Sequence, residues 1–413
     1  MKRRYLVDHK KSACLFLLVF ISYALIYMTK NCYSAAMASI VDAGVMTKSE
    51  TGLIAAAFYL VYAPFQIVGG IAADKFSPAK LIIIGMLGAG ACNFLVYLFD
   101  NYVAMIIIWS LNAVFQFGIW PSIFKIVVSQ LAPEDRMRGI FLINFSTPFG
   151  LLISYGIAIF ISEWKLNFLV SAITLFSLCV VFFAVYKHLS RAMVEDGSVK
   201  NVKAQAVISL SGKELFKLLI KAGIPIMLIV GMAQSMINLG VKSLAPTMLM
   251  ESYEAVSPSL ANALNIILVI AGPIGLCVSR LPFFKKFSEP LVITGFFAIM
   301  LIPLFVITFI GKLHVGIIVF ALFVLMLATS GTSIFFSYIY KKFEKYGSVA
   351  TLSGLFNCMS SLGIVLANYV FARMAEVFGW ETTTLCWFIF IALSFVLMLV
   401  SVPIWRRFEK KYL

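Results

Sequence analysis

Three lysines are the residues of this chain best placed to do chemistry. Lys30, Lys125 and Lys242 each lie deep inside an apolar stretch, and no Asp or Glu accompanies them at that depth. A lysine at the centre of a bilayer costs about 2.5 to 3.5 kcal/mol, so three facing lipid would cost on the order of the whole stability of a domain. We therefore expect them to face something polar, and an unneutralised cluster of cations indicates an anion.

The lysines lie on apolar segments that recur through the whole chain. The sequence is 62% hydrophobic and only 12% charged, whereas soluble proteins are about 45–50% apolar and about 25% charged. We expect an all-α integral membrane protein with twelve transmembrane helices. The expected spans are 12–38, 51–73, 80–99, 102–131, 139–162, 165–188, 222–249, 258–279, 289–311, 314–340, 347–376 and 380–405.

The basic residues fall on alternate connections between these spans, with clusters in the N-terminal tail, the 187–221 segment and the C-terminal tail. By the positive-inside rule, both termini are cytoplasmic in a multi-pass protein of the cytoplasmic membrane. The net charge of +15 is then a consequence of topology, so we expect no nucleic-acid partner. The basic residues that we assign to the opposite side are Lys48, Lys165, Lys312 and Arg373.

The longest polar interruption, near the middle, divides the chain into two halves of six spans. At its end, Lys213, Lys217 and Lys221 recur every four residues among apolar neighbours, which predicts a short amphipathic helix on the membrane surface. We expect a basic tail (1–11), a six-helix bundle (12–188), a linker (189–221), a second six-helix bundle (222–405) and a basic tail (406–413).

The two halves echo each other. Asn144-x5-Gly150 recurs as Asn357-x5-Gly363, and Lys30 and Lys242 are separated by nearly the same interval. This pattern indicates a duplicated unit, with a site near mid-membrane where the halves meet. On that interpretation, the two lysines approach one cavity from opposite sides.

Polar stripes on these spans provide the candidate binding residues. Tyr23, Tyr27 and Lys30 share one helical face, and so do Asn238 and Lys242. The other candidates are Asn144, Thr147 and Asn357. Such polar side chains also serve in helix packing, and a lysine near a span end, such as Lys125, can reach an interface with its stem.

Several other kinds of site are not indicated. No Asp, Glu or His lies at mid-span, which argues against simple proton symport. The seven cysteines fall in apolar spans without CxxC spacing, so we expect neither zinc nor a disulfide framework. No Ser/His/Asp constellation, metal cluster or phosphate loop stands out, so we expect no enzyme activity, cofactor or metal.

One loop resembles a family signature. Gly70, Asp74 and Lys75, between the second and third spans, resemble the loop motif of the major facilitator superfamily (glycine, three residues, aspartate, basic). The resemblance implies two pseudo-symmetric six-helix bundles, with this loop making a gating contact at the cytoplasmic face. The equivalent loop from Gly275 to Arg280 lacks the acid.

Within that superfamily, the chain is most similar to the organophosphate:phosphate antiporters. Trp120, Pro121 and Lys125 resemble their tryptophan-proline-x3-arginine segment, and Lys30 takes the place of a phosphate-binding arginine. Asn238 stands where the family has a second arginine, and Thr147 where it has a histidine. Because lysine lacks the bidentate fork of arginine, a carboxylate or sulfonate fits as well as a phosphate ester.

The sequence therefore predicts a secondary transporter that moves a small organic anion by alternating access, through anion exchange. Lys30 and Lys242 would hold the anion, with the other candidates orienting it. Two alternatives remain: a non-transporting membrane sensor of an anionic metabolite, and a proton-coupled exporter. We expect a monomer whose partners are the anion and the lipid bilayer.

Overall fold

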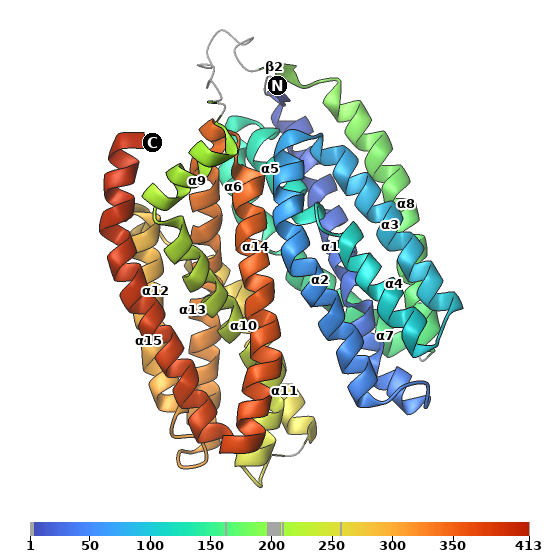
Figure 1. The fold of residues 1–413 in the computed structure, drawn as a ribbon, viewed down its shortest axis with the longest axis vertical. Helices are drawn as coiled ribbons and strands as arrows, with labels where there is room; N and C mark the ends of the chain where they lie inside the picture. The colour runs from blue at the N-terminus through green and yellow to red at the C-terminus, as the bar shows by residue number, and fades with distance from the viewer. Residues whose placement is uncertain (1–3, 162, 196–207, 209, 257, 413) are drawn as a thin grey trace. The chain divides into compact units, whose positions relative to one another are not determined.

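A computed structural model of the chain describes residues 4–161, 163–195, 208, 210–256 and 258–412, and nearly all of them are helical (Figure 1). The α-helices of these residues are α1 (His9–Asp42), α2 (Lys48–Lys75), α3 (Pro78–Leu98), α4 (Tyr102–Phe115), α5 (Ile119–Ser129), α6 (Arg136–Ile143), α7 (Ser146–Phe160), α8 (Trp164–Ser190), α9 (Gly212–Lys221), α10 (Ile224–Ser252), α11 (Pro258–Val278), α12 (Glu289–Ile307), α13 (Val315–Lys342), α14 (Val349–Leu366) and α15 (Ala372–Tyr412).

The helices form two compact units. Unit 1 comprises Met1–Ser209 with Phe343–Cys358, and unit 2 comprises Leu210–Lys342 with Met359–Leu413. The sequence-based division placed the whole of α14 in the second bundle, whereas its first part clusters with unit 1 because it is bonded to α2, as described below. Within the expected 189–221 linker, residues 196–207 and 209 lie outside the described residues.

Long apolar helices dominate both units. Among the described residues, eleven helical segments are long and apolar enough to cross a membrane, and α11, in place of the expected span 258–279, contributes the shorter apolar stretch Ile266–Val278. Leu60, Val180 and Ile302 are more than 60% exposed. Apolar side chains exposed in such numbers suit a lipid-facing surface.

Each unit has its own helix packing. In unit 1, α1 packs on α7 and α8, and α3 packs on α8 and α4. The rings of Tyr33 and Phe168 lie against Trp109, at 5.2 and 5.7 Å between centroids, in a buried aromatic core. In unit 2, α13 packs on α11 and α12, and α15 packs on α12 and α10. In the same way, α2 packs on α4 and α5 in unit 1, and α10 packs on α11 in unit 2.

The expected fourth and fifth spans are each interrupted. The first breaks between α4 and α5 at residues 116–118, and the second breaks between α6 and α7 at residues 144–145. A two-residue antiparallel pairing of β1 (Arg4–Tyr5) with β2 (Val194–Glu195) corrects the all-helical expectation slightly. Here two extended segments exchange backbone hydrogen bonds, which ties the N-terminal tail to the end of α8.

Candidate functional site

Lys30 lies among aromatic rings. In unit 1, its Nζ is 3.7 Å from the centroid of the Tyr62 ring and 5.4 Å from the rings of both Phe58 and Tyr59. The ring of Tyr27, one turn before Lys30 on α1, lies 6.0 Å away. We call these four residues the aromatic cage. Three of them, Phe58, Tyr59 and Tyr62, come from α2.

The cage explains how the cation is tolerated without an acid. Within the described part of the chain, the Lys30 ammonium forms neither an ion pair nor a hydrogen bond. A cation–π contact is worth about 0.5 to 2 kcal/mol, so several rings can offset much of the insertion cost of about 2.5 to 3.5 kcal/mol. Rings accept none of the three N–H donors of lysine as a carboxylate would, so these donors remain available to an anion.

Tyr62 connects the cage to α14. Asn357 Nδ2 donates to Tyr62 Oη at 3.4 Å and to Gln66 Oε1 at 2.6 Å. Gln66 is fully buried, and its Nε2 has no partner among the described residues. A polar side chain from the first part of α14 thus reaches the same face of α2 that holds Lys30.

Unit 2 carries a second lysine in a polar network. Lys242 Nζ donates to Asn238 Oδ1 at 2.9 Å, and Asn238 Nδ2 donates to Thr329 Oγ1 at 2.7 Å. Gln234 Nε2 donates to the Thr329 carbonyl at 2.8 Å, which extends the network along α10 and α13. Two N–H donors of Lys242 have no acceptor in the described part of unit 2. Asn238 therefore orients the ammonium.

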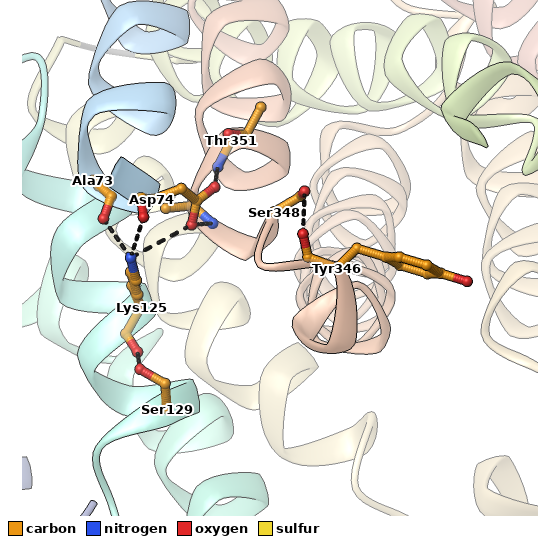
Figure 2. A network of polar contacts seen from close by, with 8 residues as sticks. Ala73, Asp74, Lys125, Ser129, Tyr346, Ser348 and Thr351 are labelled. Atoms are coloured by element: carbon orange, nitrogen blue, oxygen red, sulfur yellow. Dashed lines mark hydrogen bonds and ion pairs between the residues drawn. The ribbon is translucent and has the colours of Figure 1, made fainter. Parts of the chain in front are cut away.

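Lys125 has a different environment from the one expected. Figure 2 shows its ammonium at the end of α2, where it donates to the carbonyls of Ala73 (2.6 Å) and Asp74 (2.9 Å). Asp74 Oδ1 lies 3.9 Å from the same nitrogen. The expectation that no acid accompanies Lys125 was therefore wrong, because the fold brings Asp74 to it from another helix.

Asp74 also caps α14. Its Oδ2 accepts from the Thr351 amide at 2.6 Å and its Oδ1 accepts from the Ala350 amide at 3.2 Å (Figure 2). A carboxylate at a helix N-terminus satisfies free amides and favours the helix dipole. The ammonium of Lys125, which belongs to α5, lies at the C-terminal end of α2. There it interacts favourably with the negative end of the α2 dipole and with the Asp74 carboxylate. Asp74 thus links α5, α2 and α14.

Helices α2 and α14 also approach each other closely at two glycines, where no side chain separates their backbones. A Cβ on Gly354 would lie 2.3 Å from the Gln66 carbonyl oxygen, and one on Gly70 would lie 2.5 Å from the Ala350 carbonyl oxygen. Arg136 Nη1 also pairs with Glu344 at 3.1 Å, just before α14, with both side chains nearly buried. These contacts fasten residues 343–358 to α2 and α6.

The remaining candidate residues lie apart from these contacts or bond locally. The ring of Tyr23 lies 4.8 Å from that of Trp120, tilted by 37°. Asn144 Nδ2 donates to the Ile140 carbonyl and Thr147 Oγ1 donates to the Asn144 carbonyl, so both are occupied at the break between α6 and α7. Lys75 is exposed at the end of α2.

Sequence reasoning missed the contribution of α2 to the cage. A signal was present, because Phe58, Tyr59, Tyr62 and Gln66 follow at helical spacing on one face of an apolar segment. The signal is weak because aromatic residues are common throughout the chain. Their grouping around Lys30 depends on the packing of α1 against α2.

Comparisons with known proteins identify similar sequences and a similar fold. The profile of the Major Facilitator Superfamily matches residues 19–367. The membrane sensor protein UhpC of Salmonella typhimurium is 34% identical over 98 residues, which is 24% of this chain and 22% of that protein. A probable hexose phosphate transport protein of Chlamydia trachomatis is 23% identical over 122 residues, 30% of this chain and 27% of that protein. The chain thus spans about a quarter of the length of the curated relatives it matches.

A solved structure is similar over nearly the whole chain. The crystal structure of the transporter FucP in its outward conformation has a TM-score of 0.70 and covers 95% of this chain and 99% of that one. The sequence identity is 15%, so the likeness concerns the fold.

Proposed function

Because this chain belongs to the Major Facilitator Superfamily, we propose that it is a secondary transporter that carries a small organic anion by alternating access. The observation that supports this proposal most directly is the environment of Lys30. Four aromatic rings surround its ammonium, and its N–H donors stay available. A cation kept at this depth without an acid is costly unless it has a use. Binding of an anion is the use that its chemistry favours.

The two units supply comparable chemistry. We assign the charge to Lys30 and Lys242, and the orientation of Lys242 to Asn238. Tyr23 and Tyr27 would shape the path along α1. In this proposal α11 is the eighth of twelve spans, both termini are cytoplasmic, and the protein works as a monomer without enzyme activity or cofactor.

Exchange rather than net leak follows from the same charges. A carrier that closes around an empty site must desolvate an unneutralised ammonium, whereas a bound anion neutralises it. The loaded form should therefore reorient faster than the empty form. A proton-coupled exporter is less well supported, because no carboxylate faces Lys30 or Lys242 within the described residues.

Asp74 and Lys125 are better suited to gating than to binding. Both groups are engaged at the ends of α2 and α14. We propose that Gly70, Asp74 and Lys125 close one side of the pathway, and that opening it breaks the Asp74 cap. Lys75, exposed beside them, would add to the charge of this end.

We propose a broader class of anion than the names of the relatives indicate. A probable hexose phosphate transport protein is among them, which favours a phosphate ester. Lysine offers a point charge instead of the planar fork that matches phosphate, so a sugar carboxylate or a sulfonate remains a candidate. Asn144, Thr147 and Asn357 would need to exchange their present bonds to contact it.

The test is anion counterflow in proteoliposomes. Lys30→Ala should abolish exchange of phosphate esters or carboxylates that the native protein exchanges, whereas Lys312→Ala, at an exposed lysine paired with Glu381, should leave it unchanged. Counterflow that survives Lys30→Ala would refute the assignment. Lys242→Ala tests the second unit separately.

A sensor is the second candidate, favoured by the 34% identity with the membrane sensor protein UhpC over 98 residues. Thermal-shift binding and flux distinguish the two functions. An anion that stabilises the protein by about 2.7 kcal/mol at 100 times its dissociation constant, without any counterflow, would indicate a sensor.

A further inference from the structure

The outward face of α9 combines exposed apolar and basic side chains. Leu218 and Leu219 are buried against the unit, whereas Phe216 and Ile220 are 64% and 50% exposed. Lys213, Lys217 and Lys221 are exposed on the same outward side. A helix that presents aromatic and aliphatic anchors beside lysines is suited to the interface between headgroups and acyl chains.

A second element completes a basic site at the end of α9. The Nζ atoms of Lys221 on α9 and Lys411 on α15 lie 5.7 and 5.6 Å from the centroid of one ring, that of Tyr412. Figure 1 shows α9 close to the C-terminal end of α15 in unit 2. Two like charges thus converge on one aromatic side chain.

No acid neutralises this pair in the part of unit 2 that the structure describes. Neither Lys221 nor Lys411 has an ion pair within the described residues of unit 2. The nearby Glu409 is engaged by Lys342 at 2.5 Å. Glu214, at the other end of α9, forms a capping box with Ser211, whose amide lowers the pKa of its carboxyl and so keeps it ionised.

The position of α9 is fixed by a sharp turn. Gly223 has a φ of 74°, a left-handed conformation that favours glycine. A Cβ there would lie 3.3 Å from Ile404 on α15, so the turn lies directly against that helix. The turn therefore places the end of α9 beside α15, the helix that carries Lys411 and Tyr412.

We propose that Lys221, Lys411 and Tyr412 form a binding site for the headgroup of an anionic phospholipid. The phosphate lies between the two ammonium groups, and Phe216 and Ile220 lie among the adjoining glycerol and acyl groups. Charge complementarity and the exposed apolar anchors favour a lipid over a soluble phosphate compound. Under the proposed topology, this lipid belongs to the cytoplasmic leaflet, where anionic lipids gather.

The test is native mass spectrometry of the detergent-solubilised full chain titrated with phosphatidylglycerol or phosphatidylcholine. We expect a preference for phosphatidylglycerol, which the double variant Lys221→Gln/Lys411→Gln weakens by about 10- to 30-fold. The matched control, Lys285→Gln/Lys286→Gln, removes the same charge from exposed lysines elsewhere in unit 2 and should change affinity by less than about 3-fold.

Three outcomes would overturn the proposal. The first is unchanged phosphatidylglycerol binding in the double variant, and the second is an equal loss in the control, which would indicate charge alone. The third is a site saturated equally well by glycerol phosphate, which would indicate a soluble ligand. Transport is not the readout, so failure here leaves the proposed function untouched.

Discussion

At the scale of the residue, Lys30 shows how a membrane protein keeps a cation without neutralising it. Its type and depth could be predicted from the sequence, because a lone lysine in an apolar span is unusual. The cage could not, because Phe58, Tyr59 and Tyr62 lie on α2 and meet Lys30 only through packing. The partner of Lys125 was missed for the same reason.

Removing the nearest ring should expose this stabilisation. We expect Tyr62→Leu to lower the free energy of unfolding by about 0.5 to 2 kcal/mol through the lost cation–π contact. Tyr62→Phe, which keeps the ring and loses only the 3.4 Å bond from Asn357, should cost less. Measuring the cost of Tyr62→Leu in the native protein and in the Lys30→Met variant completes a double-mutant cycle. An equal cost of Tyr62→Leu in both backgrounds would show that the ring does not act on the cation.

At the scale of the element, the joining of α2 to α14 explains the loop signature physically. The motif could be identified from Gly70, Asp74 and Lys75, and its gating role was expected by resemblance. The sequence did not reveal that Asp74 caps residues 350 and 351, because no local pattern links positions so far apart. Gly354 completes the joint, since only a bare backbone fits there.

A methyl group at this joint should separate the helices. Gly354→Ala would place its Cβ 2.3 Å from the Gln66 carbonyl oxygen, and overpacking of this kind costs about 1 to 3 kcal/mol. Gly295→Ala, in α12, has no atom within 4 Å and serves as the matched control. The midpoint of thermal unfolding should fall for the first variant and stay level or rise for the second. Equal midpoints would contradict the close approach.

The Asp74 cap should be coupled to Lys125. Asp74→Asn removes the charge that faces two amides and one ammonium, so we expect a loss of about 0.5 to 2 kcal/mol. Lys125→Ala should cost less when Asp74 is already Asn, because the ion pair is then absent. Strictly additive unfolding energies would show that the 3.9 Å pair contributes nothing.

At the scale of the whole molecule, the family, the helical fold and the multi-pass location in the plasma membrane were predicted from the sequence and are confirmed. Composition and the loop signature were sufficient, since apolar spans leave few alternatives to helix. The division of the chain was less predictable. α14 is split after Cys358 between the two units because its first turns are bonded to α2, which a symmetry argument does not anticipate.

The proposed topology can be checked without substitutions. Trypsin should cleave the basic 189–221 segment in inverted membrane vesicles and leave it intact in right-side-out vesicles, because the positive-inside rule places it in the cytoplasm. Fragments corresponding to the two halves of the chain, separated by gel electrophoresis, are the expected result. Cleavage of this segment in right-side-out vesicles would show that the orientation is the opposite of the one proposed.

The phenol ring above Lys30 gives the protein a built-in optical reporter. A phenol absorbs in the near ultraviolet according to the charge beside it, and Tyr62 has an ammonium 3.7 Å from its centroid. An anion that draws this ammonium aside changes that charge. Difference spectra of the native protein with and without the anion would therefore report occupancy without a label, and the Tyr62 contribution should be missing from the same difference in Tyr62→Leu.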